Sequence, residues 1–94
     1  MRYRTKIEIM CQVLEAAKGS GATKTRIMYK AFLSYIQLRE QIPFLLEHNM
    51  LKFDLDTLTY KTTEKGLEFI ELYNKMSNVI FEEEEEENEL QLQV

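Results

Sequence analysis

The sequence predicts a small α+β domain that is mainly α, with three helices, a β-hairpin and a C-terminal helix. Apolar residues recur at steps of three and four from residue 4 to about residue 48 and again after residue 63, which is the spacing of helices that bury one face. Residues 51–62 instead alternate apolar and polar side chains, as strands do. A chain of 94 residues is long enough for one such domain with a single modest core.

The first expected helix covers about residues 4–18 and has a wide apolar face. One stripe consists of Ile7, Met10, Cys11, Leu14 and Ala17, and an adjacent stripe of Ile9, Val13 and Ala16. A helix with so wide an apolar face packs deeply or contacts two surfaces. Gly19 is well placed to end it in a left-handed conformation.

Two further helices follow, joined by a tight turn. Thr23 can cap a short helix at residues 24–31, and Ser34 can cap a third helix at residues 35–48. Asn49 tolerates the left-handed conformation that ends such a helix. The sequence therefore predicts a helix-turn-helix.

Pro43 lies inside the third helix. A proline there removes one backbone donor and costs about 3 kcal/mol unless the chain kinks. We expect a bend near Arg39 to Pro43, or a helix that restarts at Pro43.

The hairpin is expected from residues 51–55 and 58–62, with a short turn at 56–57. Thr63 can then cap a last helix from Glu64 to about Ile80, and Glu64 suits the helix dipole.

A tight pair of helices followed by a hairpin makes a winged helix-turn-helix arrangement, in which the third helix can enter a major groove of DNA. We expect base contacts from Tyr35, Gln37, Arg39 and Gln41. We expect phosphate contacts from Arg2, Arg4, Lys6, Lys24, Arg26, Lys30, Ser34, Lys52, Lys61 and Lys65.

Four stretches of the sequence carry a resemblance to a known family: Lys24 to Tyr35, Gln37-Leu38, Leu45-Leu46-Glu47, and Tyr60 to Gly66. Over about residues 5 to 76 the chain resembles the small winged-helix proteins of archaea, which include compact transcriptional regulators and chromatin-type DNA-binding proteins. The resemblance implies binding of double-stranded DNA, usually as a homodimer joined through helices outside the recognition element.

The last helix also predicts a homodimer on physical grounds. Leu67, Ile70 and Tyr73 form a stripe that can cover the domain's own core, while a second stripe begins at Phe69. A helix cannot easily bury both stripes in so small a domain, although all of these residues could be monomer core. The expected dimer interface consists of Ile9, Val13, Phe69, Leu72, Met76 and Val79.

Charge is divided unevenly along the chain. The total is 12 Lys and Arg against 16 Asp and Glu, but seven carboxylates fall in residues 82–94, so residues 1–81 carry 12 basic and 9 acidic residues, a net +3. We expect a winged-helix domain at 1–81, with a dimerisation helix at about 63–81, and a disordered acidic tail at 82–94. The alternative is that the last helix continues, since Glu favours helices.

The tail has three interpretations. It can keep the protein soluble, compete with DNA for the basic face, or bind a basic protein partner through Glu82–Val94.

The sequence gives little support for an enzyme or a cofactor. His48 is the only histidine and Cys11 the only cysteine, so neither an internal disulfide nor a thiolate metal cluster can form within one chain. No apolar run approaches the roughly 18 residues that span a membrane, and no signal peptide is evident. We expect a cytoplasmic, nucleoid-associated regulator; the alternatives are a protein-interaction module and an architectural DNA-binding protein.

Overall fold

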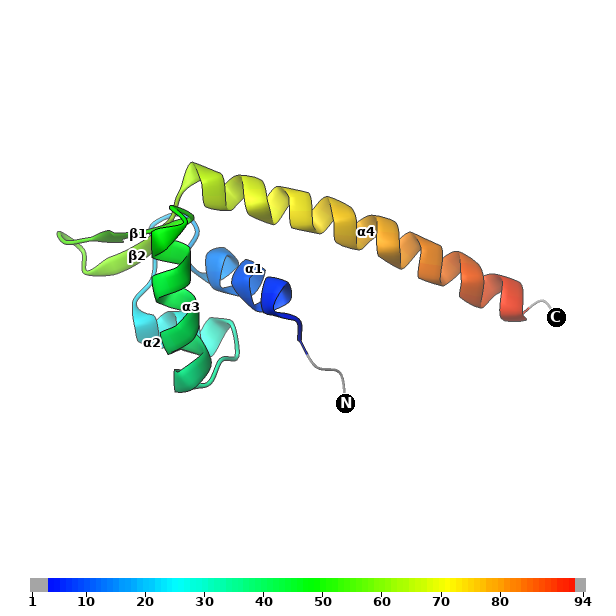
Figure 1. Cartoon of the computed structure of the whole chain (residues 1–94), viewed down its shortest axis with the longest axis horizontal. Coiled ribbons are helices and arrows are strands. Elements are labelled where there is room, and N and C mark those ends of the chain that lie inside the picture. Colours follow the sequence, from blue (N-terminus) through cyan, green and yellow to red (C-terminus); the bar gives the residue numbers. More distant parts are fainter. Residues whose placement is uncertain (1–3, 93–94) are drawn as a thin grey trace.

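A computed structural model of the chain describes residues 4–92, with side chains described from residue 4 to residue 80. Its elements are α1 (Lys6–Ala16), α2 (Lys24–Lys30), α3 (Tyr35–Glu47), β1 (Leu51–Asp54), β2 (Thr59–Thr62) and α4 (Glu64–Leu92) (Figure 1). The predicted order of three helices, a hairpin and a last helix is therefore confirmed.

Each helix of the first three begins at a hydroxyl side chain. Thr5, Thr23 and Ser34 each accept a hydrogen bond from the backbone N–H three residues later, which satisfies a donor that the helix leaves unpaired. At α3 the Gln37 side chain also accepts from the Ser34 backbone N–H, completing a capping box. Thr63 accepts from the Gly66 N–H at 3.1 Å and starts α4 in the same way.

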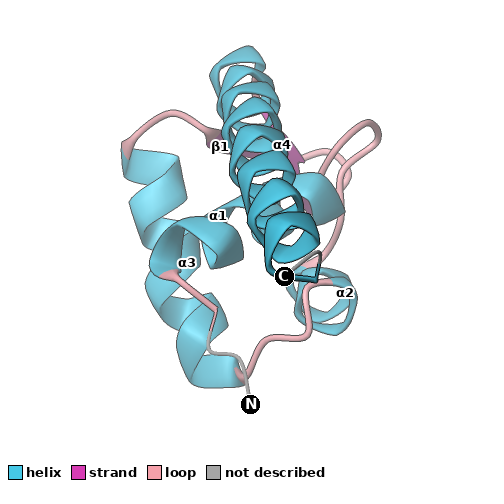
Figure 2. Ribbon diagram, turned by 90° about the vertical axis from the view of Figure 1, so that its right-hand side faces the viewer, coloured by secondary structure: helices cyan, strands magenta, loops and turns pink. Residues whose placement is uncertain are grey.

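The core is built around α1, which contacts α2, α3, α4 and β2. Viewed along α4, α1 lies between α3 on one side and α2 on the other (Figure 2). Its Val13 and Leu14 side chains have no exposed surface, and Ile27 and Leu45 reach the same core from α2 and α3. Most side chains of both predicted stripes of α1 are therefore buried within one chain.

The hairpin pairs in antiparallel register, with Leu51 opposite Thr62 and Asp54 opposite Thr59. Its turn is longer than expected, because Leu58 has a φ of +55° and lies outside β2. The Thr62 hydroxyl donates to the Leu14 carbonyl at 2.6 Å, which ties the base of the hairpin to the end of α1.

Pro43 neither splits nor ends α3, which runs unbroken from Tyr35 to Glu47. A restart at Pro43 was therefore a wrong expectation. Pro43 and Arg39, whose carbonyl loses its helical partner, both lie on the exposed side of the helix. Water can hydrate that carbonyl there, so the missing donor costs less than it would in a buried helix.

α4 extends beyond the residue at which we expected it to end. It reaches Leu92 rather than Ile80 and projects past the body of the domain (Figure 1). The helical backbone thus includes the glutamate run, as we expected if the last helix continued instead of giving way to a disordered tail. The side chains beyond residue 80 lie outside those described. The division into a domain at 1–81 and a separate tail stays a prediction.

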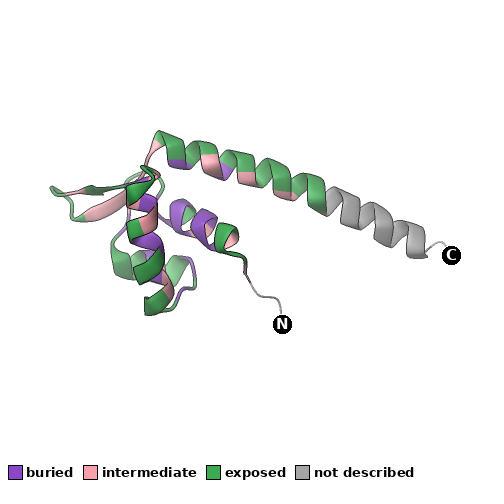
Figure 3. Ribbon diagram, viewed as in Figure 1, coloured by how far each residue is buried: buried purple, intermediate pink, exposed green. Residues whose placement is uncertain are grey.

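Only part of the expected dimer interface is accessible on the single chain (Figure 3). Val13 is completely buried and cannot contact a partner, and Ile9 is nearly so. Phe69 packs against the chain's own core, because it lies on the flank of α4 that faces α1. The members of the set that remain exposed are Leu72, Met76 and Val79, with Ile80 beside them.

Gly66 lets α4 cross closely over the end of α3. A Cβ at this position would overlap the Met50 carbonyl oxygen and lie 2.6 Å from the Thr62 methyl carbon. We expect Gly66→Ala to lower the free energy of unfolding by about 1–3 kcal/mol in urea denaturation, despite alanine's better helix propensity. Glu68→Ala, at an exposed position two residues later in α4, should change it by less than about 0.5 kcal/mol. Equal effects of the two substitutions would contradict this packing.

Candidate nucleic-acid interface

α2, α3 and the hairpin lie together at the end of the body opposite to the one toward which α4 projects (Figure 1). Lys24, Arg26 and Lys30 are exposed on α2, and none of them forms an ion pair with another described residue. α2 carries no carboxylate of its own. This short helix is therefore the most cationic element at that end of the molecule.

A groove of about 220 Å³ runs between α3, the start of α2 and β2. Tyr35 and Arg39 lie on its α3 side, one helical turn apart, and Tyr60 lies on its β2 side. The Lys24 ammonium is 6.0 Å from the centre of the Tyr60 ring. The groove combines apolar walls with two cations, and it is lined by Lys24, Tyr35, Leu38, Arg39, Ile42, Pro43, Leu46 and Tyr60.

The structure does not bring the four predicted base-contacting residues together. Gln37 is occupied at the capping box, and Gln41 is buried with only 6% of its surface exposed. The expectation for Gln41 is wrong because we took every second residue of α3, whereas a helix advances about 100° per residue. Residues 37 and 41 consequently lie on the flank away from Tyr35 and Arg39.

Sequence reasoning missed the true outer ridge of α3. It consists of Ile36, Arg39, Glu40, Pro43 and Glu47, all of them exposed. A helical projection centred on the buried Leu38 and Leu45 finds this ridge from sequence alone. With one cation and two carboxylates, the ridge is not itself basic.

The lysines of the hairpin differ from one another. The Lys61 ammonium pairs with the Asp54 carboxylate at 2.9 Å, whereas Lys52 is exposed with no described ion pair. This hydrogen bond from Lys61, followed by the Asp56 and Thr57 backbone N–H groups, holds the pKa of Asp54 below its usual range. Strand alternation puts Lys52 and Lys61 on the hairpin face away from Tyr60 and the groove.

Arg4 has a different position from the one we expected. Its guanidinium donates to the Gln12 side-chain oxygen and to the Ala31 and Phe32 carbonyls, each at 2.6 Å. Phe32 occupies the turn between α2 and α3 with a φ of +53°. Arg4 thus fixes the helix-turn-helix turn to the start of α1 instead of reaching out to phosphate. A contact across 27 residues leaves no local signal in the sequence.

Three other predicted phosphate contacts have side chains engaged within the domain, and a fourth lies outside the described residues. The Lys65 ammonium donates to the His48 carbonyl at 2.9 Å, and the Lys6 ammonium lies over the Phe44 ring on the α1 side of α3. Arg2 lies outside the described residues. The Ser34 hydroxyl is exposed but caps α3.

The described residues offer few groups for catalysis or metal binding. Among them no three His, Cys, Asp or Glu side chains gather as metal ligands. Cys11 is buried, and its pKa is raised by burial and then by the nearby Glu15, so its thiol is a poor nucleophile. Of the helices described, none is long and apolar enough to cross a membrane.

Comparison with known proteins agrees with this geometry. A family model described as winged helix-turn-helix matches residues 3–81. The chain belongs to the winged helix-turn-helix family. The predicted arrangement, with the hairpin as its wing, is therefore confirmed.

Among solved structures, the crystal structure of Sso10a-2, a DNA-binding protein from Sulfolobus solfataricus, is similar with a TM-score of 0.72. It is 25% identical in sequence, and the match covers 93% of this winged-helix chain and 96% of that one. No curated protein sequence matches. The expected resemblance to small archaeal winged-helix proteins is thus confirmed.

Arg4→Gln should lower the free energy of unfolding by about 1.5–3 kcal/mol, because two carbonyls at the helix-turn-helix turn lose a charged donor. Arg4→Lys keeps the positive charge but lacks the planar guanidinium that reaches several acceptors at once. We therefore expect lysine to restore less than half of the lost free energy of unfolding. The measurement is urea denaturation, with Lys18→Gln as a control at the other, exposed end of α1. Full restoration by lysine would show that charge alone is needed there.

Proposed function

We propose that this winged-helix protein binds double-stranded DNA with the end formed by α2, α3 and the hairpin. The observation that carries the proposal is the set of exposed cations Lys24, Arg26 and Lys30 on α2, which form no ion pair with another described residue and lie next to the groove of Tyr35 and Arg39. Similarity to Sso10a-2, described as a DNA-binding protein, supports the same conclusion.

In this proposal α2 supplies affinity and α3 supplies the reading of sequence. Cations on α2 displace counterions from the phosphates, which gives binding that depends strongly on salt. Arg39 can pair with guanine in the major groove, and Tyr35 lies one turn before it. Lys52 can reach a separate backbone segment from the outer face of the wing.

We further propose that the protein acts as a homodimer through α4. Leu72, Met76 and Val79 are exposed at steps of four and three along one stripe, and Ile80 adjoins them. Such a seam of apolar side chains is the pattern by which helices pair. A second α4 would cover the stripe and leave the DNA-binding end free. A role in transcription regulation follows from binding as a dimer at defined sites.

A protein-interaction module is the second candidate, and one patch favours it. Tyr29, Phe32, Tyr35 and Ile36 are all exposed around the helix-turn-helix turn, and Phe32 has 84% of its surface accessible. Exposed apolar clusters of this kind mark contact surfaces for proteins. The same patch lies beside the α2 cations, so DNA and a protein would compete for it.

Arg26→Ala and Lys30→Ala should each weaken binding to random duplex DNA at about 50 mM salt and reduce the salt slope by about one. Each removes a cation that has no described ion pair. Fluorescence anisotropy over a salt series gives both quantities. Lys75→Ala, on α4 and paired with Glu71, is the matched control and should leave the slope unchanged. Unchanged affinity in both α2 variants would favour the protein-interaction module.

Leu72→Glu combined with Met76→Glu should convert the dimer to a monomer in sedimentation equilibrium, because it puts two carboxylates into the apolar seam. Asn74→Glu adds charge on the other side of α4, where it should leave the dimer intact. Wild-type protein that sediments as a monomer at tens of micromolar would contradict the dimer.

A further inference from the structure

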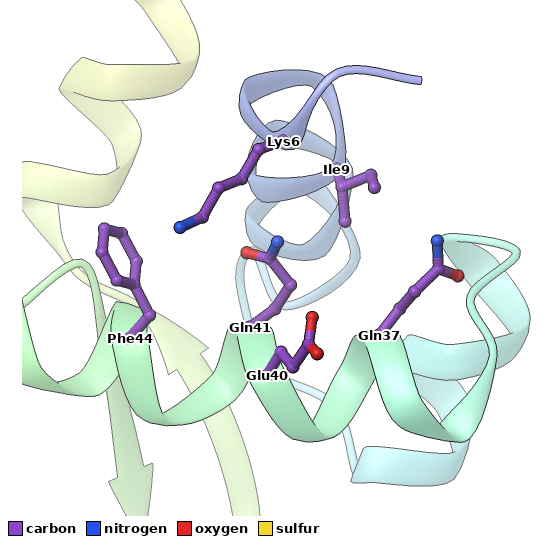
Figure 4. A pocket seen from close by; sticks show the side chains of 6 residues that line it. All are labelled: Lys6, Ile9, Gln37, Glu40, Gln41 and Phe44. Carbon is purple, nitrogen blue, oxygen red and sulfur yellow. The ribbon is translucent and has the colours of Figure 1, made fainter. Parts of the chain in front are cut away.

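A second hollow, of about 480 Å³, lies between α1 and α3 on the flank of α3 away from the groove. Figure 4 shows Lys6 and Ile9 extending from α1 toward the polar side chains of α3. Its lining residues are Lys6, Ile9, Gln37, Glu40, Gln41 and Phe44. The hollow lies beside the proposed DNA-binding face and shares only Glu40 with the outer ridge of α3.

Gln41 is the unusual member of this hollow. Its side chain is 94% buried, and its Oε1 atom has no hydrogen-bond partner among the described residues. A buried carbonyl oxygen without a donor costs free energy that an apolar residue of the same size would not cost. Figure 4 shows the Gln41 amide extending from α3 into the space between α1 and α3, where a hydrogen-bond donor that reaches the floor of the hollow would satisfy its oxygen.

Two opposite charges flank this acceptor. The Lys6 ammonium lies 4.7 Å from the centre of the Phe44 ring, and Glu40 lies on the exposed side of the hollow. Neither charge forms an ion pair with another described residue. Ile9 and Phe44 supply apolar walls. A cation, a carboxylate, a buried acceptor and apolar walls together complement one class of small molecule.

We propose that the hollow binds a free α-amino acid with an apolar side chain. Its carboxylate pairs with Lys6, its ammonium donates to Gln41 Oε1 and to the Glu40 carboxylate, and its side chain packs on Ile9 and Phe44. Glu40 and Gln41 are consecutive residues of α3 and Lys6 lies on α1, so the two charged groups of one amino acid can meet partners on both helices. A carboxylic acid or an amine alone meets only one of the two charges.

The position of the hollow gives such a ligand a regulatory effect, and this consequence rests on the proposed function. A molecule held by Lys6 and Gln41 joins α1 to α3, and α3 is the helix that we propose reads DNA. Binding therefore favours one placement of α3 and changes the affinity for DNA by the same factor as DNA changes the affinity for the ligand.

The test uses the full chain without DNA and the free L-amino acids at up to about 10 mM. We expect a subset of the apolar amino acids to raise the unfolding temperature in a saturable way and to give binding heat in calorimetry. The matching carboxylic acid and amine should bind at least about ten-fold more weakly. Gln41→Leu keeps the volume and removes the acceptor, and Lys6→Met removes the cation, so each should weaken binding at least about ten-fold. Lys18→Met, at the other end of α1, should not.

Three results would overturn the proposal: no amino acid shifts the unfolding temperature, the shift persists in both Gln41→Leu and Lys6→Met, or the carboxylic acid binds as tightly as the amino acid. The last outcome would show a simple anion site. Because the assay contains no DNA, a failure of DNA binding in the salt series would not affect the test of amino-acid binding. An amino acid that binds without changing the affinity for DNA would remove only the regulatory consequence.

Discussion

Burial of α1 in the middle of the domain is the constraint on which the other elements depend. This helix of 11 residues contacts α2, α3, α4 and β2, and its Val13 and Leu14 side chains have no exposed surface. Each neighbour is placed by packing against it rather than by a large sheet. Two polar ties complete the arrangement, because Arg4 holds the helix-turn-helix turn and Thr62 holds the base of the wing. The geometry of the proposed DNA-binding end therefore follows from a helix that lies outside it.

This dependence explains which parts of the molecule could be predicted. Helix starts were readable because Thr23, Ser34 and Thr63 act locally, and the hairpin was readable from alternation. The role of Arg4 was not, because it depends on a distant segment that meets it only in the folded chain. Gln41 could have been assigned inward by a stricter helical projection, whereas no spacing rule finds the Arg4 contact. Whether residues 82–94 form a separate tail is still a prediction.

The two ends of the molecule have different chemistry. Exposed cations that form no ion pair within the described part of the chain gather on α2, while exposed apolar side chains follow one stripe of α4 at the opposite end. The outer ridge of α3 has more carboxylates than cations, so affinity for a polyanion has to come from α2 and the wing. If cations on α2 and the wing supply the affinity, substitutions on α3 can alter sequence preference without abolishing attachment to DNA.

The length of α4 has a geometric consequence. A helix of 29 residues is about 43 Å long at 1.5 Å per residue, and it is stiff over that distance. If two copies pair along it, the helix sets how far apart the two wings stand and how they are rotated about the pair's axis. Adding or removing seven residues would move each wing by about 10 Å along its helix and nearly preserve that rotation, whereas a change of two residues would turn each wing by about 200°. In the proposed dimer, the spacing of the two DNA segments would thus be encoded in the residue count of a segment that touches neither.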